Sequence, residues 1–314
     1  MDYDNVCLVP RTISQIKSRD DIDISSHNSD IDLDVPIIAS PMRDVCDGNI
    51  AHRIWELGGL GIIHRFCSIE EQVEYYMQEG HSFCAIGLND ENRFKALYDE
   101  GCKQFCIDVA NGANIAVAQA IEYYLDMSED HIIFIVGNIA SVECFNWLEK
   151  QPNVVGIRVG IAGGDVCTTK NATGIYHPAL SLIKECYEGR KTSTLIIADG
   201  GVRCPGDFCK AIAFGADAVM LGSLIAATAE SPAELIRQGN SLFKLYHGSA
   251  SFDIQSTYKV PKYIEGKSKL IPYEEDTLEA LMIRFKDGLR SSMSYFNARN
   301  LNEYRRNISY KITR

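Results

Sequence analysis

Eight short apolar runs recur along the chain from Val35 onward, with longer amphipathic stretches between them. Most of these runs are apolar at every position, which is typical of strands covered on both faces in a parallel sheet. The predicted strands are residues 35–39, 60–64, 83–87, 104–109, 132–136, 156–161, 195–198 and 218–221. Eight strand–helix units in series favour a closed (β/α)8 TIM barrel. A doubly wound sheet is the alternative, but no Gly-x-Gly-x-x-Gly follows the first strand.

The stretches between the strands carry helix patterns and helix start signals. The predicted helices are residues 69–78, 91–100, 115–125, 142–150, 178–187, 205–213, 231–237 and 278–290. Ser68 precedes the first of these with Glu71 three residues later, the spacing of a capping box, and Pro205 stands in the first turn of another. We expect a single barrel domain over residues 1–314, with a short mobile flap at about 252–267 and a C-terminal helix and tail at 278–314.

Composition and charge limit the class of protein. A hydrophobic content of 46% is typical of a globular chain, and no apolar run approaches the ~20 residues of a membrane helix. The acidic start argues against a signal peptide, and the 11 cysteines lack framework spacing, which predicts reduced thiols in a cytoplasmic protein. A net charge of −11 argues against a nucleic-acid partner, but not against a small anionic ligand in a local cradle.

The loop after the sixth predicted strand carries the candidate nucleophile. Ala162, Gly163 and Gly164 are small residues that allow a sharp turn and a close approach to a ligand before the chain reaches Cys167. A thiol at the end of such a turn is placed as a nucleophile would be. The alternative is a tight loop that holds Cys167 as a small buried side chain. Polar or glycine residues at most other strand ends favour a site, although turn preferences alone explain some of them.

The ordered motifs of the chain resemble the IMP dehydrogenase/GMP reductase family over nearly the whole length. The matching stretches are PIIASPM at 36–42, GGLGIIHR at 58–65, DVANG at 108–112, GN at 137–138, VCTT at 166–169, IADGGVR at 197–203 and VMLGS at 219–223. The resemblance implies a (β/α)8 barrel that forms a homotetramer. It also implies redox chemistry at C2 of a purine nucleotide or nucleoside.

Two absences favour the GMP reductase branch of this family. The dehydrogenases activate water with an arginine on a long flap, whereas residues 252–264 contain no arginine. The dehydrogenases also usually carry a CBS regulatory insertion after the second strand, and the stretch from Arg65 to Phe83 has no room for one. The alternatives are an IMP dehydrogenase without its regulatory module and, in a different class, a non-catalytic purine-binding barrel.

The resemblance also assigns roles to individual residues. Cys167 would attack purine C2, while Thr169 and Glu265 would relay a proton to the departing ammonia. The implied substrate-binding residues are Ser40, Asp165, Asp199, Gly201, Gly222, Ser223, Tyr246, Gly248 and Ser249. The implied residues at the nicotinamide end of the cofactor are Asp108, Ala110, Asn111 and Gly112. The cofactor would be NADPH, with NADH as the alternative.

Several of these residues have simpler interpretations. Asp199 fits a turn cap, Thr169 fits a helix N-cap, Glu265 fits solvated surface and Tyr246 fits the core. No His or Cys is spaced to make His64 or His247 a metal ligand, so we expect no protein metal site. In the dehydrogenases, loop carbonyls near the cysteine hold potassium, and a monovalent cation therefore stays an open question for this chain.

Asp165 departs from the family pattern. Relatives usually carry Gly-Ile-Gly-Pro-Gly-Ser before the Val-Cys pair, and that serine is a phosphate contact, whereas this chain places Asp165 there. A carboxylate beside a phosphate dianion costs on the order of a kcal/mol or more. Two accounts are open: Asp165 points to solvent or pairs with a cation such as Lys170, or the substrate is not an ordinary 5′-monophosphate.

Overall fold

Eight parallel strands close into a barrel, as predicted, in the order β10-β11-β4-β5-β6-β7-β8-β9. The computed structural model describes residues 1–11, 13–78, 80–258, 260–273 and 275–313. The barrel strands are β4 (Ile37–Ala39), β5 (Leu60–Ile63), β6 (Phe83–Ile86), β7 (Gln104–Asp108), β8 (Ile133–Ile139), β9 (Val154–Val159), β10 (Leu195–Asp199) and β11 (Ala218–Leu221). The barrel closes where β11 pairs with β4, with Val219 opposite Ile37.

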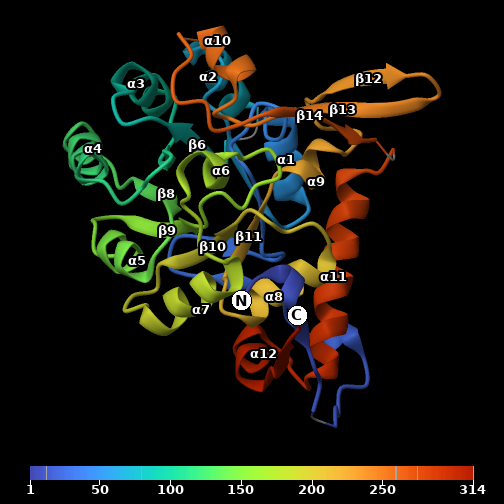
Figure 1. The fold of residues 1–314 in the computed structure, drawn as a ribbon. Helices are drawn as coiled ribbons and strands as arrows, with labels where there is room; N and C mark the ends of the chain where they lie inside the picture. Colours follow the sequence, from blue (N-terminus) through green and yellow to red (C-terminus); the bar gives the residue numbers. More distant parts are fainter. Residues whose placement is uncertain (12, 79, 259, 274, 314) are drawn as a thin grey trace.

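Helices surround the barrel between successive strands (Figure 1). They are α1 (Gly48–Glu56), α2 (Ile69–Met77), α3 (Glu91–Asp99), α4 (Ile115–Asp126), α5 (Val142–Leu148), α6 (Thr169–Thr173), α7 (Ala179–Gly189), α8 (Pro205–Ala213) and α9 (Ser223–Ala226). The predicted cap at Ser68 is confirmed, because its hydroxyl accepts the Glu71 N–H at 3.1 Å at the start of α2. In the part of the chain described, no helix is both long and apolar enough to cross a membrane.

Alternating side chains of the strands fill two cores. One set, which includes Ile38, Ile62, Cys106 and Ile197, points into the barrel, and the other packs against the helices. Leu33, from the short hairpin of β2 (Ser26–His27) and β3 (Asp32–Leu33), belongs to the inner set. This hairpin therefore closes the N-terminal end of the barrel, and the C-terminal strand ends remain available for a site.

The prediction of a helix at 231–237 was wrong. This segment enters β12 (Glu234–Gln238), which forms an antiparallel sheet with β13 (Ser241–His247) and β14 (Ser268–Pro272). Gly239 adopts φ 61° between β12 and β13, so the Gly-Asn pair makes a hairpin turn. The sequence Glu-Leu-Ile-Arg-Gln fits a helix or a strand equally well, and its antiparallel pairing with β13 makes it a strand.

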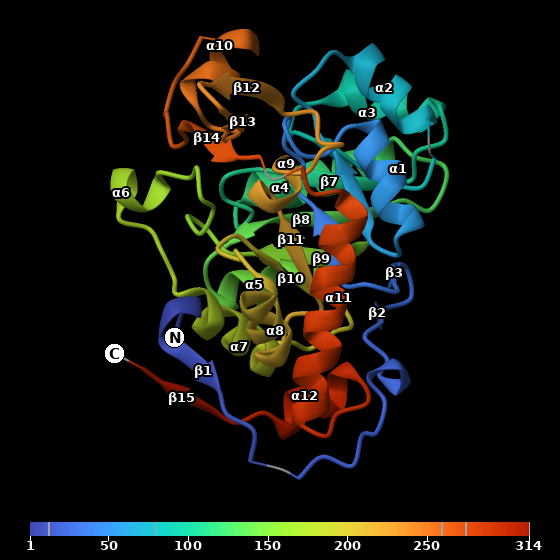
Figure 2. The same cartoon turned by 90° about the vertical axis from the view of Figure 1, so that its right-hand side faces the viewer.

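The predicted flap folds in part as a helix, α10 (Phe252–Tyr258). Figures 1 and 2 both show α10 and the β12–β14 sheet at the end of the molecule opposite α12 (Leu301–Asn307). The predicted C-terminal helix is α11 (Leu278–Tyr295), and β15 (Tyr310–Ile312) pairs with β1 (Val6–Leu8). The remaining short helices are η1 (Tyr3–Asn5) and η2 (Arg19–Asp21). Lys259 in the flap and Arg314 in the tail lie outside the described residues, and the mobility of the flap stays a prediction.

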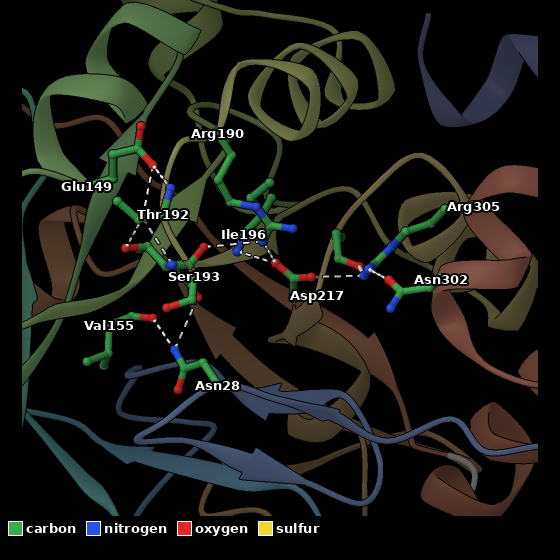
Figure 3. Close-up of polar contacts among 12 residues, drawn as sticks. Asn28, Glu149, Val155, Arg190, Thr192, Ser193, Ile196, Asp217, Asn302 and Arg305 are labelled. Carbon is green, nitrogen blue, oxygen red and sulfur yellow. Dashed lines mark hydrogen bonds and ion pairs between the residues drawn. The ribbon is translucent and has the colours of Figure 1, made fainter.

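A buried carboxylate ties the outer elements to the start of two barrel strands (Figure 3). Asp217, directly before β11, accepts hydrogen bonds from the Arg190 guanidinium, from Arg305 at 2.9 Å and from the Ile196 N–H at 2.9 Å. Only 5% of Asp217 is exposed, so solvent does not replace these partners. Asp217 thus joins α7, α12 and β10 at the end of the barrel away from the cysteine loop.

Replacing Asp217 with Ala should lower the free energy of unfolding by about 3 kcal/mol or more, because two guanidinium groups lose their buried partner. Urea unfolding followed by circular dichroism measures this change. Asp130→Ala is the matched control. The Asp130 side chain pairs with Lys103 and is 62% exposed, so the expected loss of unfolding free energy is below about 1 kcal/mol. Equal losses in the two variants would contradict the role given to Asp217.

Candidate active site

The cysteine loop leaves β9 through a turn that only glycine fits. Gly160 has φ 136°, and a Cβ there would lie 2.3 Å from the Asp199 carbonyl oxygen. Ala162 also has a positive φ of 64°, which is unusual for a residue with a side chain. The turn ends with buried Val166 and half-buried Cys167, whose N–H donates to the Gly164 carbonyl at 3.1 Å. Cys167 therefore stands at the C-terminal end of the barrel and is not enclosed in the core.

A second segment, residues 265–267, docks against the cysteine loop. Thr168 N–H donates to the Glu265 carbonyl at 2.8 Å, and Lys267 N–H donates to the Val166 carbonyl at 2.9 Å. Gly266 forms bridges with Cys167 and with Ser251, and a Cβ on Gly266 would lie 2.8 Å from the Ser251 nitrogen. This close backbone contact fixes Glu265 relative to Cys167.

The three predicted catalytic side chains form one hydrogen-bonded chain. The Cys167 thiol donates to Thr169 Oγ1 across 3.2 Å, and that hydroxyl donates to Glu265 Oε2 across 2.7 Å. The N-cap of α6 is Thr168, which makes no side-chain cap bond, so the Thr169 hydroxyl does not serve as a cap. Glu265 is likewise not simply solvated surface, since its carboxylate accepts the Thr169 proton. The arrangement gives the thiol a direct route for losing its proton.

A cavity of about 280 Å³ lies beside this loop. Its walls include seven of the nine predicted substrate residues, namely Ser40, Asp165, Asp199, Gly201, Gly222, Ser223 and Tyr246. Gly248 and Ser249 are not part of its walls, and Gly248 instead supports the docked segment by donating its N–H to the Lys267 carbonyl at 3.0 Å. Cys167 borders the cavity through Gly164, a wall residue whose Cβ position would lie 3.7 Å from Cys167 Cβ.

The N-terminal segment supplies cavity residues that sequence reasoning missed. Asp2, Tyr3 and Asp4 line the cavity, together with Tyr176 and Arg203. Tyr3 packs its ring beside Gly201, where a Cβ would meet the ring at 3.1 Å. No local pattern in the first four residues indicates this contact, which joins segments about two hundred positions apart in the chain.

An ion-pair network centred on Arg158 connects Asp199, a predicted substrate residue, with Asp108, a predicted cofactor residue. Arg158 Nε and Nη2 donate to Asp199 Oδ2 at 3.1 and 3.0 Å, and Arg158 Nη1 donates to Asp108 Oδ1 at 2.5 Å. Asn138 Nδ2 also donates to Asp199 Oδ2, at 2.7 Å. Sequence reasoning missed Arg158, although a single charged residue inside an otherwise apolar strand was a usable signal.

The network controls the charge of its members. Burial raises the pKa of the Asp108 carboxyl, but the Arg158 and Arg65 guanidinium groups outweigh it and hold that pKa below its usual range. Burial also lowers the pKa of Arg158, and the carboxylates of Asp199 and Asp108 reverse this and raise it. Asp108 is therefore kept ionised at the mouth of the barrel.

The predicted cofactor loop follows β7 at the same end of the barrel. Ala110 and Asn111 are exposed, and Asn111 Oδ1 accepts the Ala113 N–H at 3.2 Å. Gly112 is buried and donates its N–H to the Asn138 carbonyl at 2.8 Å. Asp108 is engaged by Arg158 and Arg65 and so holds the loop in place. An exposed, uncharged loop held beside Asp199 fits the amide-bearing end of a nicotinamide cofactor.

Asp165 pairs with Lys269, at 2.5 Å, and not with Lys170. The Lys170 ammonium lies over the Tyr176 ring, 3.9 Å from its centre. Of the accounts left open for Asp165, the structure shows the pairing with a cation, but the cation is Lys269 and not Lys170, and a substrate other than a 5′-monophosphate stays a prediction. β14 brings Lys269 to the cysteine loop. Because Lys269 and Asp165 are far apart in the sequence, the sequence alone does not indicate this pairing.

The structure gives no argument for a metal at this site. No group of three His, Cys, Asp or Glu side chains arranged to hold a metal occurs among the described residues. The loop carbonyls of Gly164 and Val166 each accept one backbone N–H group and keep a second lone pair, so the monovalent cation stays a prediction.

His64 lies in a second cavity, of about 260 Å³, with Asp44, Glu71 and His247. His247 Nδ1 pairs with Asp44 Oδ2 at 2.7 Å, and His64 Nδ1 accepts the Phe66 N–H at 3.1 Å. Burial lowers the pKa of His64 to about 4, despite the nearby Glu71 and Asp44 carboxylates. His64 is thus a neutral, structural histidine at the end of β5.

The fold and the loop define a class of protein: a (β/α)8 barrel with a thiol, a hydroxyl and a carboxylate in series at its C-terminal end. The chain also matches the family described as "IMP dehydrogenase / GMP reductase domain" over residues 1–314. The GMP reductase of Lactobacillus acidophilus is 32% identical over 312 residues, which cover 96% of this chain and 91% of that protein. The chain therefore belongs to the IMP dehydrogenase/GMP reductase family.

Other relatives come from both branches of this family. The GMP reductase of Bacillus subtilis is 31% identical over 321 residues, covering 100% of this chain and 96% of that protein. The inosine-5′-monophosphate dehydrogenase of Cryptosporidium parvum is 27% identical over 367 residues, covering 98% of this chain and 90% of that protein. Both alignments extend over nearly the full length of the barrel.

The neutral state of His64 predicts a pH dependence. A folded pKa of about 4 lies below the unfolded value of about 6.5, so the unfolded chain binds the extra proton as pH falls. The stability that the neutral imidazole gives the folded protein is fully present above pH 6.5. It is lost as pH falls to about 4, and the total loss of unfolding free energy is ~3 kcal/mol. NMR titration of the His64 ring measures it directly, with the protein in concentrated urea as the control. A folded-state midpoint near 6.5 would contradict the assignment.

Proposed function

We propose that this protein is a reductase of the GMP reductase type. It converts a guanine nucleotide or nucleoside into the corresponding hypoxanthine compound plus ammonia, with NADPH as the hydride donor and NADH as the alternative. The observation that carries the proposal is the Cys167–Thr169–Glu265 chain beside a cavity at the barrel mouth. The full-length similarity to proteins named GMP reductase supports the same branch.

The hydrogen-bonded chain provides the proton path of the first step. The Cys167 thiol passes its proton to Thr169 Oγ1 as Thr169 passes its own to Glu265, and the thiolate forms a bond to purine C2. Glu265 then returns a proton through Thr169 to the C2 amino group, which leaves as ammonia when the C2–N bond breaks. The product of this step is a thioimidate between Cys167 and the purine.

The barrel mouth positions the partners of the second step. NADPH, when bound, would supply a hydride that adds to C2 of the thioimidate. The C2–S bond then breaks, and the electron pair returns to Cys167 as a thiolate. Asp108, Ala110, Asn111 and Gly112 are the proposed residues at the nicotinamide end. Asp199 is the proposed ribose ligand, because Oδ2 is held by Arg158 and Asn138, while Oδ1 receives no hydrogen bond from any described residue.

Two alternatives make different predictions. An IMP dehydrogenase would form XMP and NADH from IMP and NAD, but residues 252–264 offer no arginine to activate water. A non-catalytic barrel would bind a purine without NADPH oxidation, and the intact Cys167–Thr169–Glu265 chain argues against it. The family resemblance further supports a homotetramer, which light scattering would test. The cysteine pattern supports a cytoplasmic location, which a fluorescent fusion would test.

Cys167→Ala should lower NADPH oxidation with guanine substrates by at least about a thousandfold, because the covalent route loses its nucleophile. The assay follows NADPH absorbance and ammonia release together. Cys7→Ala is the matched control, since Cys7 is an exposed free thiol on β1 and is not among the cavity's wall residues. Retained turnover in Cys167→Ala would rule out the covalent mechanism.

Glu265→Gln should lower kcat by about a hundredfold or more while the substrate KM changes little, since the amide cannot carry the proton to ammonia. Steady-state kinetics with a 2-aminopurine substrate measures both parameters. Glu188→Gln on the exposed end of α7 is the control and should leave both unchanged. A loss confined to KM would assign Glu265 to binding instead.

A further inference from the structure

The cavity beside Cys167 is acidic. Its walls contain four aspartates, Asp2, Asp4, Asp165 and Asp199, whereas Arg203 is the only cation among the described wall residues. Arg203 is itself shared between Asp4, at 2.5 Å, and Asp207, at 3.2 Å. A phosphate dianion in this cavity would thus face several carboxylates, and Arg203 could reach it only by leaving Asp4.

Three further cations near the cavity also have partners. Lys269 pairs with Asp165 at 2.5 Å, and the Lys170 ammonium lies over Tyr176. The Lys210 ammonium donates to the Tyr3 carbonyl at 2.7 Å and lies 3.6 Å from Asp207. Each of these groups already has a partner, so none stands free to neutralise a dianion.

Tyr3 forms part of the cavity wall without offering it a charge. Its side chain is only 3% exposed, and its hydroxyl is enclosed and has no hydrogen-bond partner in the part of the chain that the structure describes. Burial, with Asp207 and Asp2 nearby, raises the pKa of Tyr3. Tyr3 therefore supplies neither a cation nor an accessible donor for a phosphate.

Several acceptors meet at this cavity. An alcohol both donates and accepts, so it can donate to a carboxylate such as Asp2 or Asp165. A phosphate dianion only accepts and would leave the carboxylates unmatched. Lys269 pairs with Asp165 and so brings no net positive charge to the cavity. The wall chemistry therefore matches a neutral 5′ hydroxyl.

We propose that the substrate is a purine nucleoside with a free 5′ hydroxyl and not a nucleoside 5′-monophosphate. The proposal rests on the proposed function, because it uses the orientation that places purine C2 at Cys167 and the ribose at Asp199. Asp165 and Asp2 are then the residues that determine specificity at the 5′ end.

Calorimetric titration of the purified full chain with inosine and with IMP tests the proposal without requiring turnover. We expect inosine to bind at least about tenfold more tightly, equivalent to ~1.4 kcal/mol. We also expect added salt to improve IMP binding by screening the repulsion while leaving inosine unchanged. Tighter binding of IMP, or no binding of either compound, would overturn the proposal.

Two variants assign the effect to named residues. Asp165→Ser should raise IMP affinity by about tenfold while changing inosine affinity less than about threefold, because it removes one repulsive carboxylate. Tyr3→Phe should leave the affinity for inosine within about threefold of the wild-type value, because the Tyr3 hydroxyl is enclosed and does not contact the ligand. Asp130→Ser, on the exposed face, is the matched control. If Asp165→Ser folds but its IMP affinity is unchanged, Asp165 does not determine specificity at the 5′ end. If that variant does not fold, the comparison of inosine with IMP on the wild-type protein tests the proposal.

Activity assays separate this proposal from the proposed function. NADPH oxidation with guanosine exceeding that with GMP supports both, and preference for GMP overturns only the nucleoside proposal. No oxidation with any guanine compound, together with preferential inosine binding, overturns the reductase function and leaves the specificity of the cavity supported.

Discussion

The active-site arrangement depends on the backbone pairing between the cysteine loop and residues 265–267. Two hydrogen bonds, Thr168 N–H to Glu265 and Lys267 N–H to Val166, hold the segments together, and Gly266 allows the close approach. Without this pairing, Glu265 would be a surface carboxylate and Thr169 would have no acceptor for its proton. The Cys167–Thr169–Glu265 chain therefore arises from the loop after β9 and from a segment about a hundred positions later, joined only by tertiary structure.

The ion-pair network of Arg158, Asp108 and Asp199 holds further residues of the candidate site in position. Arg158 comes from β9, directly before the cysteine loop, and spans Asp108 at the end of β7 and Asp199 at the end of β10. A buried arginine between two carboxylates is tolerable because each charge has a partner. The strand that presents the thiol thereby also fixes the proposed ribose ligand and the proposed cofactor loop.

Much of the fold was predictable because the barrel strands are continuously apolar, and all eight lie within a few residues of their predicted positions. The hairpin of β12 and β13 was not, since Glu234–Gln238 fits a helix or a strand equally well and pairing decided between them. For the site, the strand-end rule and the family motifs located Cys167, Asp199 and Tyr246 at or beside the cavity. They could not supply Tyr3 or Lys269, because those contacts depend on how distant segments pack.

The central claim is that the Cys167 sulfur bonds to purine C2, and the most direct measurement is mass spectrometry of enzyme quenched in acid during turnover. The account predicts a purine adduct that has lost its amino nitrogen, located by peptide mapping on the peptide that contains Cys167. Sustained conversion of a guanine substrate with unmodified Cys167 at every time point, or with the adduct on another residue, would contradict it.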